Sequence, residues 1–310
     1  MTIVVAGGTG LAGSAIVRAY QAAGEDVIPV SRKVVDLLDR DATFAFIRDV
    51  KPDLIVDAAA KVGGIGANNT FPVEFLSDNV RIQSNLMEAA HAADVEKFIF
   101  LGSSCIYPRD CAQPIKEEYL LTGPLEETNS AYAVAKIAGI ELIKSFRKEY
   151  GRKWISLMPT NLYGINDNFE LQGSHVLPAF IRRFVEAAEK GAAVETLWGT
   201  GSPKREFLHV DDLASAVVHL GKTYDSSEHL NIGTGEDLTI KELAELVAEL
   251  AGFKGELAWD SSKPDGTPRK VLDVSKAKAL GWAPKISLRD GIASTIAWYK
   301  DATAKGEVRR

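Results

Sequence analysis

The sequence predicts an α/β protein in which a doubly wound parallel sheet is joined to a smaller C-terminal α/β lobe. Short runs rich in Val and Ile recur through the first half of the chain without polar alternation, which is typical of strands buried on both faces of a parallel sheet. A longer segment with helical periodicity follows each run. This is the order of repeated strand–helix–strand units with right-handed crossovers.

The expected elements follow one another closely from the N-terminus. We expect strands at 2–6, 26–30, 53–57, 97–101 and 154–158, and helices at 11–23, 39–50, 73–93 and 130–150. After about residue 160 the loops lengthen, at 164–174, 198–207 and 253–270. We therefore expect a sheet domain over 1–165, rejoined by about 207–235, and a ligand-binding lobe formed mainly by 166–310. Ligands of such sheets bind at the carboxyl ends of the strands, so loops 57–66, 102–111 and 159–175 should line the site.

Composition excludes several classes of partner. The 310 residues carry 36 Lys and Arg against 42 Asp and Glu, a net charge of −6, so an overall basic surface for nucleic acid or anionic lipid is missing. No apolar run approaches the roughly 20 residues of a membrane helix. Two cysteines make neither a disulfide framework nor a thiolate zinc site. We expect a cytoplasmic protein with no nucleic-acid, membrane or metal partner.

A glycine-rich segment lies between the first expected strand and the first expected helix. Gly7, Gly10 and Gly13 give G-x-x-G-x-x-G, and Gly8 forms an overlapping G-x-G-x-x-G with the last two. Glycines there permit a tight turn and the close approach of a pyrophosphate to the N–H groups of a helix N-terminus. The spacing also fits an ordinary Gly-rich turn, but the strand–turn–helix context favours a Rossmann-type dinucleotide site.

The end of the second expected strand indicates which dinucleotide binds. An NAD site usually has Asp or Glu there, to bond the ribose 2′-OH, whereas this sequence has Ser31, Arg32 and Lys33. A guanidinium can clamp a 2′-phosphate in a bidentate fashion. We therefore expect NADP(H), with an ordinary solvated basic pair as the alternative.

A third motif suggests chemistry on a carbonyl group. Tyr132 and Lys136 are four residues apart and share one helical face. An ammonium near a phenol lowers the phenol pKa and allows proton exchange with a carbonyl oxygen. Y-x-x-x-K alone is common on amphipathic helices. Ser103 and Ser104, which follow an expected strand, make the combination specific, because a hydroxyl there can bond the same oxygen.

Together these features resemble the extended short-chain dehydrogenase/reductase family over essentially the whole chain. The resemblance is carried by the Gly loop, by 36–39 and 57–60, and by 159–164 and 205–212. It implies cofactor contacts from Gly7, Gly10, Leu11, Ala12, Gly13, Arg32, Asp36, Leu37, Ala58, Ala59, Tyr132, Lys136, Pro159, Asn161, Leu162 and His175.

Longer stretches resemble the members that epimerise and reduce GDP-linked 4-keto sugars. They are 59–65, 101–108, 168–169 with 174–176, and 265–270. The resemblance implies a catalytic set of Ser103, Cys105, Tyr132, Lys136 and His175, with Cys105 as the base and His175 as the acid of epimerisation. A lone cysteine is otherwise more often a small buried hydrophobe. We expect that, or a surface position, of Cys111.

Two departures from the family pattern are visible. Met158 precedes Pro159 where many extended members carry Arg, and Gly8-Thr9 stands where related enzymes often have bulkier polar residues. The second departure could alter cofactor contacts, but neither touches the predicted chemistry.

The same resemblance implies substrate contacts and an assembly. The contacts are Lys61, Val62, Gly63, Ser104, Cys105, Asn161, Arg183, Trp198, Arg205 and Lys270. Arg205 and Lys270 could neutralise a sugar-nucleotide diphosphate, although solvated surface charges are the alternative. The assembly implied is a homodimer formed through the helix at 130–150 and its neighbour.

The implied reaction converts GDP-4-keto-6-deoxy-D-mannose to GDP-L-fucose with NADPH. The C4 ketone acidifies the protons at C3 and C5, so one base and one acid can invert both centres before hydride reaches C4. A related GDP-4-keto sugar of the 3-deoxy (colitose) or heptose type stays open as the substrate. An epimerase that retains NAD also stays open, although Arg32 and the Cys105/His175 pair argue against it. A non-enzymatic dinucleotide sensor is a further alternative, but such proteins often lack the Tyr/Lys pair that this sequence has.

Overall fold

A parallel six-stranded sheet forms the centre of the computed structural model, which describes residues 1–171, 173–263 and 265–309. Its strands are β1 (Thr2–Ala6), β2 (Asp26–Val30), β3 (Leu54–Asp57), β4 (Lys97–Leu101), β5 (Ile155–Pro159) and β10 (Leu230–Ile232). Their order is β10-β5-β4-β3-β1-β2, and every pairing is parallel. This confirms the expected fold class.

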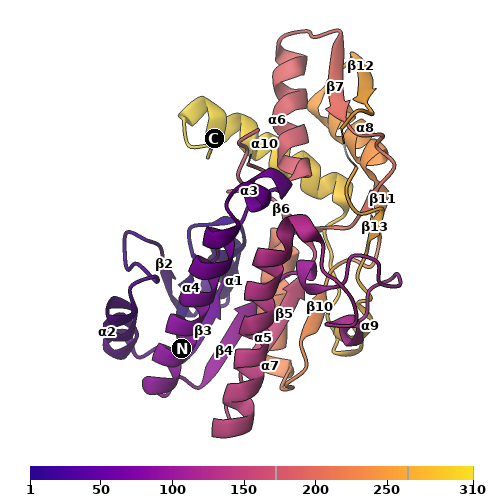
Figure 1. Cartoon of the computed structure of the whole chain (residues 1–310). Coiled ribbons are helices and arrows are strands. Elements are labelled where there is room, and N and C mark those ends of the chain that lie inside the picture. The colour runs from indigo at the N-terminus through magenta and orange to yellow at the C-terminus, as the bar shows by residue number, and fades with distance from the viewer. Residues whose placement is uncertain (172, 264, 310) are drawn as a thin grey trace.

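Helices cover both faces of this sheet (Figure 1). On one face lie α2 (Arg40–Val50), α4 (Pro72–Ala92) and α5 (Ser130–Tyr150), and on the other lie α1 (Leu11–Ala22) and α7 (Val210–Thr223). Their ends follow from local sequence. The Asp39 carboxylate accepts the Ala42 N–H at 3.0 Å and so caps α2, Pro72 opens α4, and Gly151 ends α5 at φ 69°.

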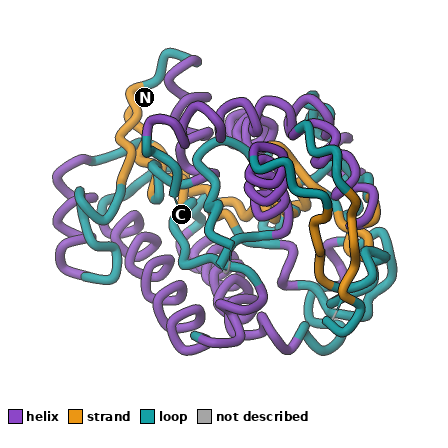
Figure 2. Tube along the Cα trace, turned by 90° about the horizontal axis from the view of Figure 1, so that it is seen from above, coloured by secondary structure: helices purple, strands orange, loops and turns teal. Residues whose placement is uncertain are grey.

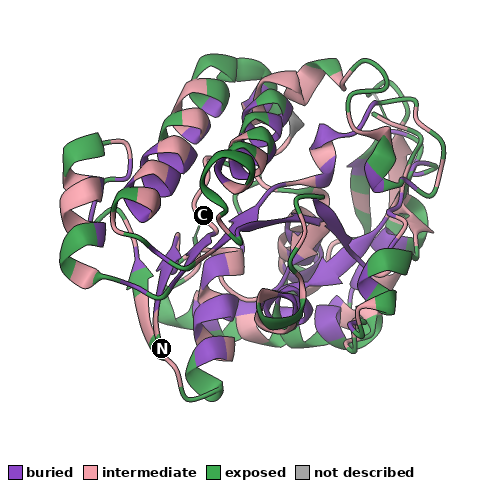
Figure 3. Cartoon of the chain, turned by 90° about the horizontal axis from the view of Figure 1, so that it is seen from below, coloured by how far each residue is buried: buried purple, intermediate pink, exposed green. Residues whose placement is uncertain are grey.

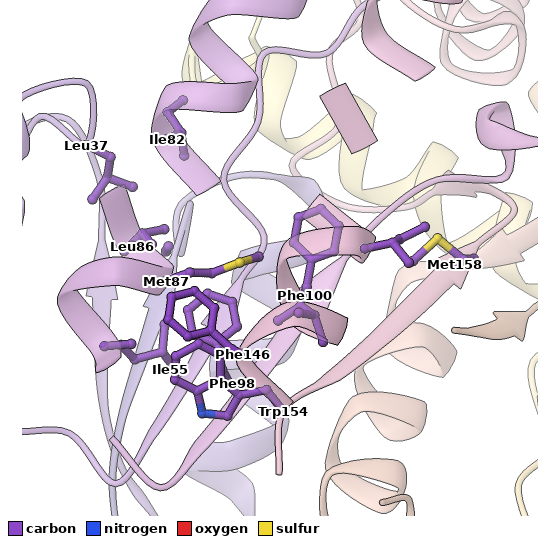
Figure 4. Close-up of a cluster of buried hydrophobic side chains, with 14 of the residues drawn as sticks. Leu37, Ile55, Ile82, Leu86, Met87, Phe98, Phe100, Phe146, Trp154 and Met158 are labelled. Atoms are coloured by element: carbon purple, nitrogen blue, oxygen red, sulfur yellow. The ribbon is translucent and has the colours of Figure 1, made fainter. Parts of the chain in front are cut away.

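The face beneath α4 and α5 carries the larger aromatic side chains. Ile55, Phe98 and Phe100 of the sheet pack there against Leu86 and Phe146 of the helices (Figure 4). Apart from the edge strand β2, the strands themselves are buried along most of their length (Figure 3). Burial on both faces explains why the strands read as continuous apolar runs in the sequence.

The second half of the chain adds a smaller set of elements beside the carboxyl ends of the strands (Figures 1 and 2). Its helices are α6 (Val176–Glu189), α8 (Ile240–Ala251), α9 (Ser275–Ala279) and α10 (Leu288–Lys305). Its strands pair as β7 (Val194–Trp198) with β12 (Glu256–Asp260), β6 (Asn161–Tyr163) with β9 (Phe207–His209), and β11 (Leu238–Thr239) with β8 (Lys204–Arg205) and β13 (Arg269–Lys270). Helices α6, α8 and α10 share a third apolar cluster.

Several of the expected loops contain regular structure. Segment 198–207 includes β8, and 253–270 includes β12 and β13. Helix α3 (Ile65–Thr70) begins within the expected loop 57–66, and 3₁₀ turns occupy η1 (Ser104–Ile106), η2 (Glu117–Tyr119) and η3 (Glu127–Asn129). Two-residue strands such as β8 and β13 are defined by pairing with segments distant in sequence. No local sequence pattern therefore predicts them.

The chain reverses its direction of travel across the sheet between β1 and β3. Strand β2 lies on one side of β1 and β3 on the other, and in such sheets ligands bind at the carboxyl ends of the strands at this switch point. Gly7 after β1 and Ala58 after β3 meet there. Among the described helices none is long and apolar enough to cross a membrane.

Candidate active site

The glycine loop is packed so closely that side chains are excluded from it. Gly7 has φ +71°, and a Cβ there would lie 2.7 Å from the Ala58 carbonyl oxygen. A Cβ on Gly13 would lie 2.1 Å from the Gly7 carbonyl oxygen. Helix α1 starts at Leu11 after Gly10, with no capping side chain. The first N–H groups of α1, those of Leu11 and Ala12 included, therefore face the loop without a capping partner.

The residues expected at the ribose and adenine lie at the end of β2 and beyond it. Arg32 is exposed directly after the strand and takes part in no ion pair of the described residues. Asp36 is exposed, and its carboxylate accepts the Leu38 N–H at 3.0 Å. Leu37 is buried, and its carbonyl accepts the Asn85 side-chain amide at 2.8 Å. The exposed guanidinium is free to meet an anion.

Ser103 and Cys105 lie on the 3₁₀ turn η1 that follows β4. The Ser103 hydroxyl accepts the Cys105 N–H at 3.2 Å, which fixes the turn, and Ser104 beside it is buried. Cys105 itself is half-buried, and its sulfur accepts a hydrogen bond from the Asn129 side-chain amide at 3.5 Å. The thiol is therefore not a core side chain. Cys111 is also half-buried, and burial raises the pKa of its thiol.

Tyr132 lies in the first turn of α5, close to both residues of η1. Its ring packs edge-on against Phe75 of α4, with 6.4 Å between centroids. Burial raises the pKa of the phenol, as does the neighbouring Cys105, while a hydrogen bond with the Ser103 side chain lowers it. Ser103, Cys105 and Tyr132 thus form one group at the carboxyl end of β4.

Lys136 lies one turn further along α5 and points into the protein. Its ammonium donates a hydrogen bond to the Leu101 carbonyl at 2.9 Å and lies 5.8 Å from the centroid of the Tyr132 ring. Burial is the largest influence on the Tyr132 pKa and raises it, and Lys136 is not among the groups that shift this pKa. The Lys136 ammonium is directed at a β4 carbonyl and not at the phenol. Desolvation therefore dominates the pKa of the Tyr132 phenol.

His175 is the residue from which α6 begins, and its side chain is exposed and does not cap the helix. The surrounding protein still desolvates the imidazole enough to lower its pKa. The preceding loop is fixed by a hydrogen bond from the Gly64 N–H to the Gly173 carbonyl at 3.0 Å. No hydrogen bond joins His175 to Cys105 among the described residues, so their facing arrangement stays a prediction.

The loop after β3 carries three of the expected substrate contacts. Lys61 forms an ion pair with Glu74, and its backbone exchanges hydrogen bonds with the Asn79 side chain. Val62 is 61% exposed. Gly63 is tight, since a Cβ there would lie 3.2 Å from the Phe75 ring. The loop is thus held between α4 and the segment that precedes His175.

The expected diphosphate cations lie side by side. Arg205 on β8 and Lys270 on β13 are register partners in adjacent parallel strands. Desolvation lowers the pKa of Arg205, while Glu126 acts in the opposite direction. Two neighbouring cations from segments far apart in the sequence favour an anion-binding role over isolated surface charges.

Arg183 and Trp198 also lie in the second half of the chain. Arg183 pairs with Glu195 at 2.6 Å and donates to the Thr196 carbonyl at 2.5 Å, which ties α6 to β7. Trp198 is 72% exposed at the end of β7, and the Lys263 ammonium lies 5.8 Å from its ring. Arg183 is therefore already engaged, whereas the indole is open to a ligand.

The expected contacts at the end of β5 and just after it are built into the fold. Pro159 ends β5, and Leu162 packs on the apolar cluster beneath α1 and α7. The Asn161 side-chain amide donates to the Glu206 carbonyl at 2.8 Å. One side of the Asn161 amide is therefore committed to the fold.

Three polar residues around the site were not among the expected site residues. Asp57 is completely buried at the end of β3, Asn129 holds the Cys105 sulfur, and the buried Glu206 carboxylate accepts N–H groups from Thr234, Gly235 and Leu272. A charged residue that ends an apolar run, as Asp57 does, was the available signal. The other two depend on contacts distant in sequence.

One surface hollow of the described residues lies away from this site. It has a volume of about 570 Å³ and lies at the amino ends of the strands, lined by Lys51, Asp94, Arg152 and Lys153 among others. None of the predicted site residues lines it.

A glycine loop at the switch point of a parallel sheet, with Ser, Tyr and Lys at the end of β4, defines a dinucleotide-dependent enzyme of the short-chain dehydrogenase/reductase type. The chain belongs to the NAD dependent epimerase/dehydratase family, whose model matches residues 3–233.

Relatives with curated names cover almost the whole chain. It is 54% identical to GDP-L-fucose synthase 1 of Arabidopsis thaliana, with 96% of this chain and 92% of the relative covered. Identity to the GDP-L-fucose synthase of Escherichia coli is 49%, with 96% of each covered. The chain is 36% identical to the GDP-L-colitose synthase of Yersinia pseudotuberculosis, with 96% of this chain and 98% of the relative covered.

Solved structures show the same fold. A GDP-L-fucose synthetase from Naegleria fowleri bound to NADP superposes with a TM-score of 0.91 at 28% identity, covering 100% of this chain and 96% of the other. A GDP-6-OMe-4-keto-L-xylo-heptose reductase from C. jejuni gives a TM-score of 0.92 at 34% identity, with 97% of each covered.

Proposed function

We propose that the protein converts GDP-4-keto-6-deoxy-D-mannose to GDP-L-fucose, by epimerisation at C3 and C5 followed by reduction at C4 with NADPH. The observation that carries this proposal is the grouping of Ser103, Cys105 and Tyr132 at the carboxyl end of β4. A carbonyl-directed hydroxyl pair suits reduction, and an accessible thiol beside it suits proton removal next to the same carbonyl.

The residues present fit NADP(H). Gly7 and Gly13 leave no space for a Cβ, so backbone lines the loop, and the uncapped start of α1 offers N–H groups to a pyrophosphate. Arg32 would hold the 2′-phosphate, and Lys136 the ribose nearest the chemistry. When bound, NADPH supplies the hydride that reduces the C4 carbonyl.

In epimerisation the chain's own residues move protons at C3 and C5. Cys105 takes the proton, because a thiol has an ordinary pKa closer to neutrality than a serine hydroxyl. The negative charge that develops on the C4 oxygen is stabilised by the Ser103 and Tyr132 hydroxyls. His175 returns a proton from the other face of the sugar, a role suited to an imidazole near neutral pH.

In reduction Tyr132 gives its proton to the C4 oxygen. Its raised pKa keeps the phenol protonated at neutral pH, which suits a proton donor. The Ser103 hydroxyl holds the same oxygen, and Arg205 with Lys270 would hold the diphosphate at the far end of the substrate. The shared oxygen is used in both reactions.

We also propose that the chain works as a homodimer, through α4 and α5. Val73 and Leu76 of α4 and Val134 of α5 are large apolar residues exposed on these two helices. Light scattering at micromolar concentration tests this proposal. We likewise propose two parts of the chain. Residues 1–165, with the 207–235 segment, bind NADP, and the rest forms a substrate lobe. A cytoplasmic location stays a prediction.

The function is tested with purified protein, NADPH and candidate GDP-4-keto sugars. We expect one NADPH consumed per GDP-L-fucose formed from GDP-4-keto-6-deoxy-D-mannose, as read by absorbance and product NMR. Faster turnover of a 3-deoxy or heptose substrate would replace the substrate assignment. Conversion without NADPH consumption would favour an NAD-retaining epimerase.

A further inference from the structure

The carboxylate of Asp57 is buried without full hydrogen bonding. It lies at the last position of β3 and has no exposed surface. One carboxylate oxygen accepts the Ala59 N–H at 3.1 Å, and the other has no hydrogen-bond partner among the described residues. A buried carboxylate in this condition needs a nearby opposite charge.

The strand register brings Asp57 next to Lys136. Asp57 pairs with Phe100 of β4, so the two side chains stand on one face of the sheet. That is the face of Ile55 and of the cluster beneath α4 and α5 in Figure 4. The Lys136 ammonium lies 4.8 Å from the centroid of the Phe100 ring and bonds the carbonyl of the next residue, Leu101. Carboxylate and ammonium therefore flank one phenylalanine.

The other described elements packed here add no further charge. From β1 the register partner of Asp57 is Ala6. From α4 comes Gln83, whose amide donates to the Ala135 carbonyl at 2.7 Å. From α5 come Lys136 and the neutral phenol of Tyr132. The one electrostatic partner of Lys136 found in the described chain is Asp57.

We propose that Asp57 is the counter-charge that keeps the buried Lys136 ammonium protonated, and is thus a positioning residue for the reduction. This inference deepens the proposed function and rests on it, because in that function a charged Lys136 holds the cofactor ribose next to the reacting carbonyl.

Desolvation and charge act against each other on both groups. Burial lowers the pKa of Lys136, and Asp57 raises it. Burial raises the pKa of Asp57 to about 6, and Lys136 lowers it. Removing the carboxylate leaves desolvation unopposed at Lys136, so the lysine should lose its proton at a lower pH.

The direct test follows the ionisation of Lys136 itself. Protein labelled with ¹³C at the lysine Cε atoms is titrated by NMR, and the Lys136 signal is identified by its loss in Lys136→Met. Asp57→Asn keeps the side-chain shape and removes the charge. We expect the Lys136 midpoint to fall by about one pH unit or more in this variant. An unchanged midpoint would overturn the proposal, as would a neutral Lys136 at pH 7 in the parent protein.

Asp167→Asn is the matched control for this titration. Asp167 is also a buried carboxyl with a raised pKa, but its electrostatic partner is Arg309. The Lys136 midpoint should therefore stay where it is in the parent. A fall in this control equal to that in Asp57→Asn would show a general effect of removing buried charge and would overturn the pairing.

Kinetics separate this inference from the proposed function. If both hold, the alkaline limb of kcat for ketone reduction shifts in Asp57→Asn to lower pH by the same amount as the Lys136 midpoint. A shifted midpoint with an unshifted limb supports the charge pair and contradicts the role proposed for Lys136 in reduction. Circular dichroism and NADPH binding at pH 6 check that the variant is folded.

Discussion

Tyr132 is the proposed proton donor of the reduction. Tyr132→Phe removes the proton donor but keeps the ring that packs on Phe75. General acid catalysis contributes roughly 10²–10⁴-fold, so we expect kcat for reduction to fall by that factor while the NADPH affinity stays near the parent value. Stopped-flow reduction with fluorescence titration measures both. A variant that retains more than about a tenth of the parent rate would show that another group donates the proton.

Arg32 should decide the choice between the two nicotinamide cofactors. Its guanidinium is exposed at the end of β2 and has no ion-pair partner among the described residues. Loss of a charge-assisted contact costs on the order of 1.5–3 kcal/mol, about tenfold or more in affinity. We expect Arg32→Ala to lose that much NADPH affinity with little change for NADH. Lys33→Ala is the control, and an Arg32→Ala protein with full NADPH preference contradicts the assignment.

Sequence motifs identify the residues that react more readily than they identify the residues that support them. Ser103, Tyr132 and Lys136 become candidates through residue type and spacing, and Cys105 through the family resemblance; the fold then brings Ser103, Cys105 and Tyr132 together after β4. Asp57 and Asn129 could not be predicted, because their roles arise from burial and from neighbours supplied by other elements. The Tyr132 pKa shows the same limit, since desolvation in the fold dominates what the Y-x-x-x-K spacing suggests.

At the scale of elements, Glu206 joins three segments of the second half of the chain. Its carboxylate accepts the N–H groups of Thr234 at 2.6 Å, Gly235 at 2.7 Å and Leu272 at 2.9 Å. In Glu206→Gln the side-chain NH₂ group replaces one carboxylate oxygen and faces at least one of these N–H groups, so two donors meet without an acceptor. An unsatisfied buried donor costs about 1–3 kcal/mol, so we expect a clear loss of unfolding free energy in urea. Glu245→Gln, on an exposed position of α8, should have no comparable effect.

The elements that could be predicted are those whose own sequence stabilises them. β1, β3 and β4 are apolar runs, and their observed bounds differ from the expected ones by at most one residue. Helix α3 was missed because its Gly, Asn and Thr residues are weak helix formers. It is held instead by the Asn68 side chain, which donates to the Gly63 and Gly64 carbonyls.

At the scale of the whole molecule, the pH dependence of stability should report the ionisation of Asp167. This buried carboxyl lies close in space to Arg309 near the end of the chain. Burial raises the pKa of Asp167 to about 7, although Asn168 and Arg309 lower it. The folded state therefore binds this proton more tightly than the unfolded state, whose Asp has a pKa of about 3.9. The stability contributed by the neutral carboxyl is full below about pH 4 and is lost as the pH rises through 7.

Asp167→Asn removes this dependence. We expect calorimetry to show little change in Tm at pH 4, and at pH 8 a stabilisation on the order of 4 kcal/mol relative to the parent, since roughly three pKa units correspond to about 1.4 kcal/mol each. A variant that is less stable than the parent at pH 8 would show that the ionised carboxylate is compensated by Arg309.

The central claim is that one pocket performs two separable reactions, with Cys105 serving the first. In the proposed mechanism hydride transfer needs no thiol, because Ser103 and Tyr132 are the residues assigned to the C4 oxygen. Cys105→Ala should therefore stop proton exchange at C3 and C5 and leave some reduction, which yields a 4-reduced sugar that has not been epimerised. Cys111→Ala is the matched control and should behave as the parent.

The most direct measurement is deuterium incorporation at C3 and C5 of the GDP-4-keto sugar in D₂O, with NADP⁺ in place of NADPH so that no reduction occurs. NMR should show exchange at both positions with the parent protein and with Cys111→Ala, and none with Cys105→Ala. Normal deuterium uptake by Cys105→Ala would show that this thiol is not the base and would contradict the account.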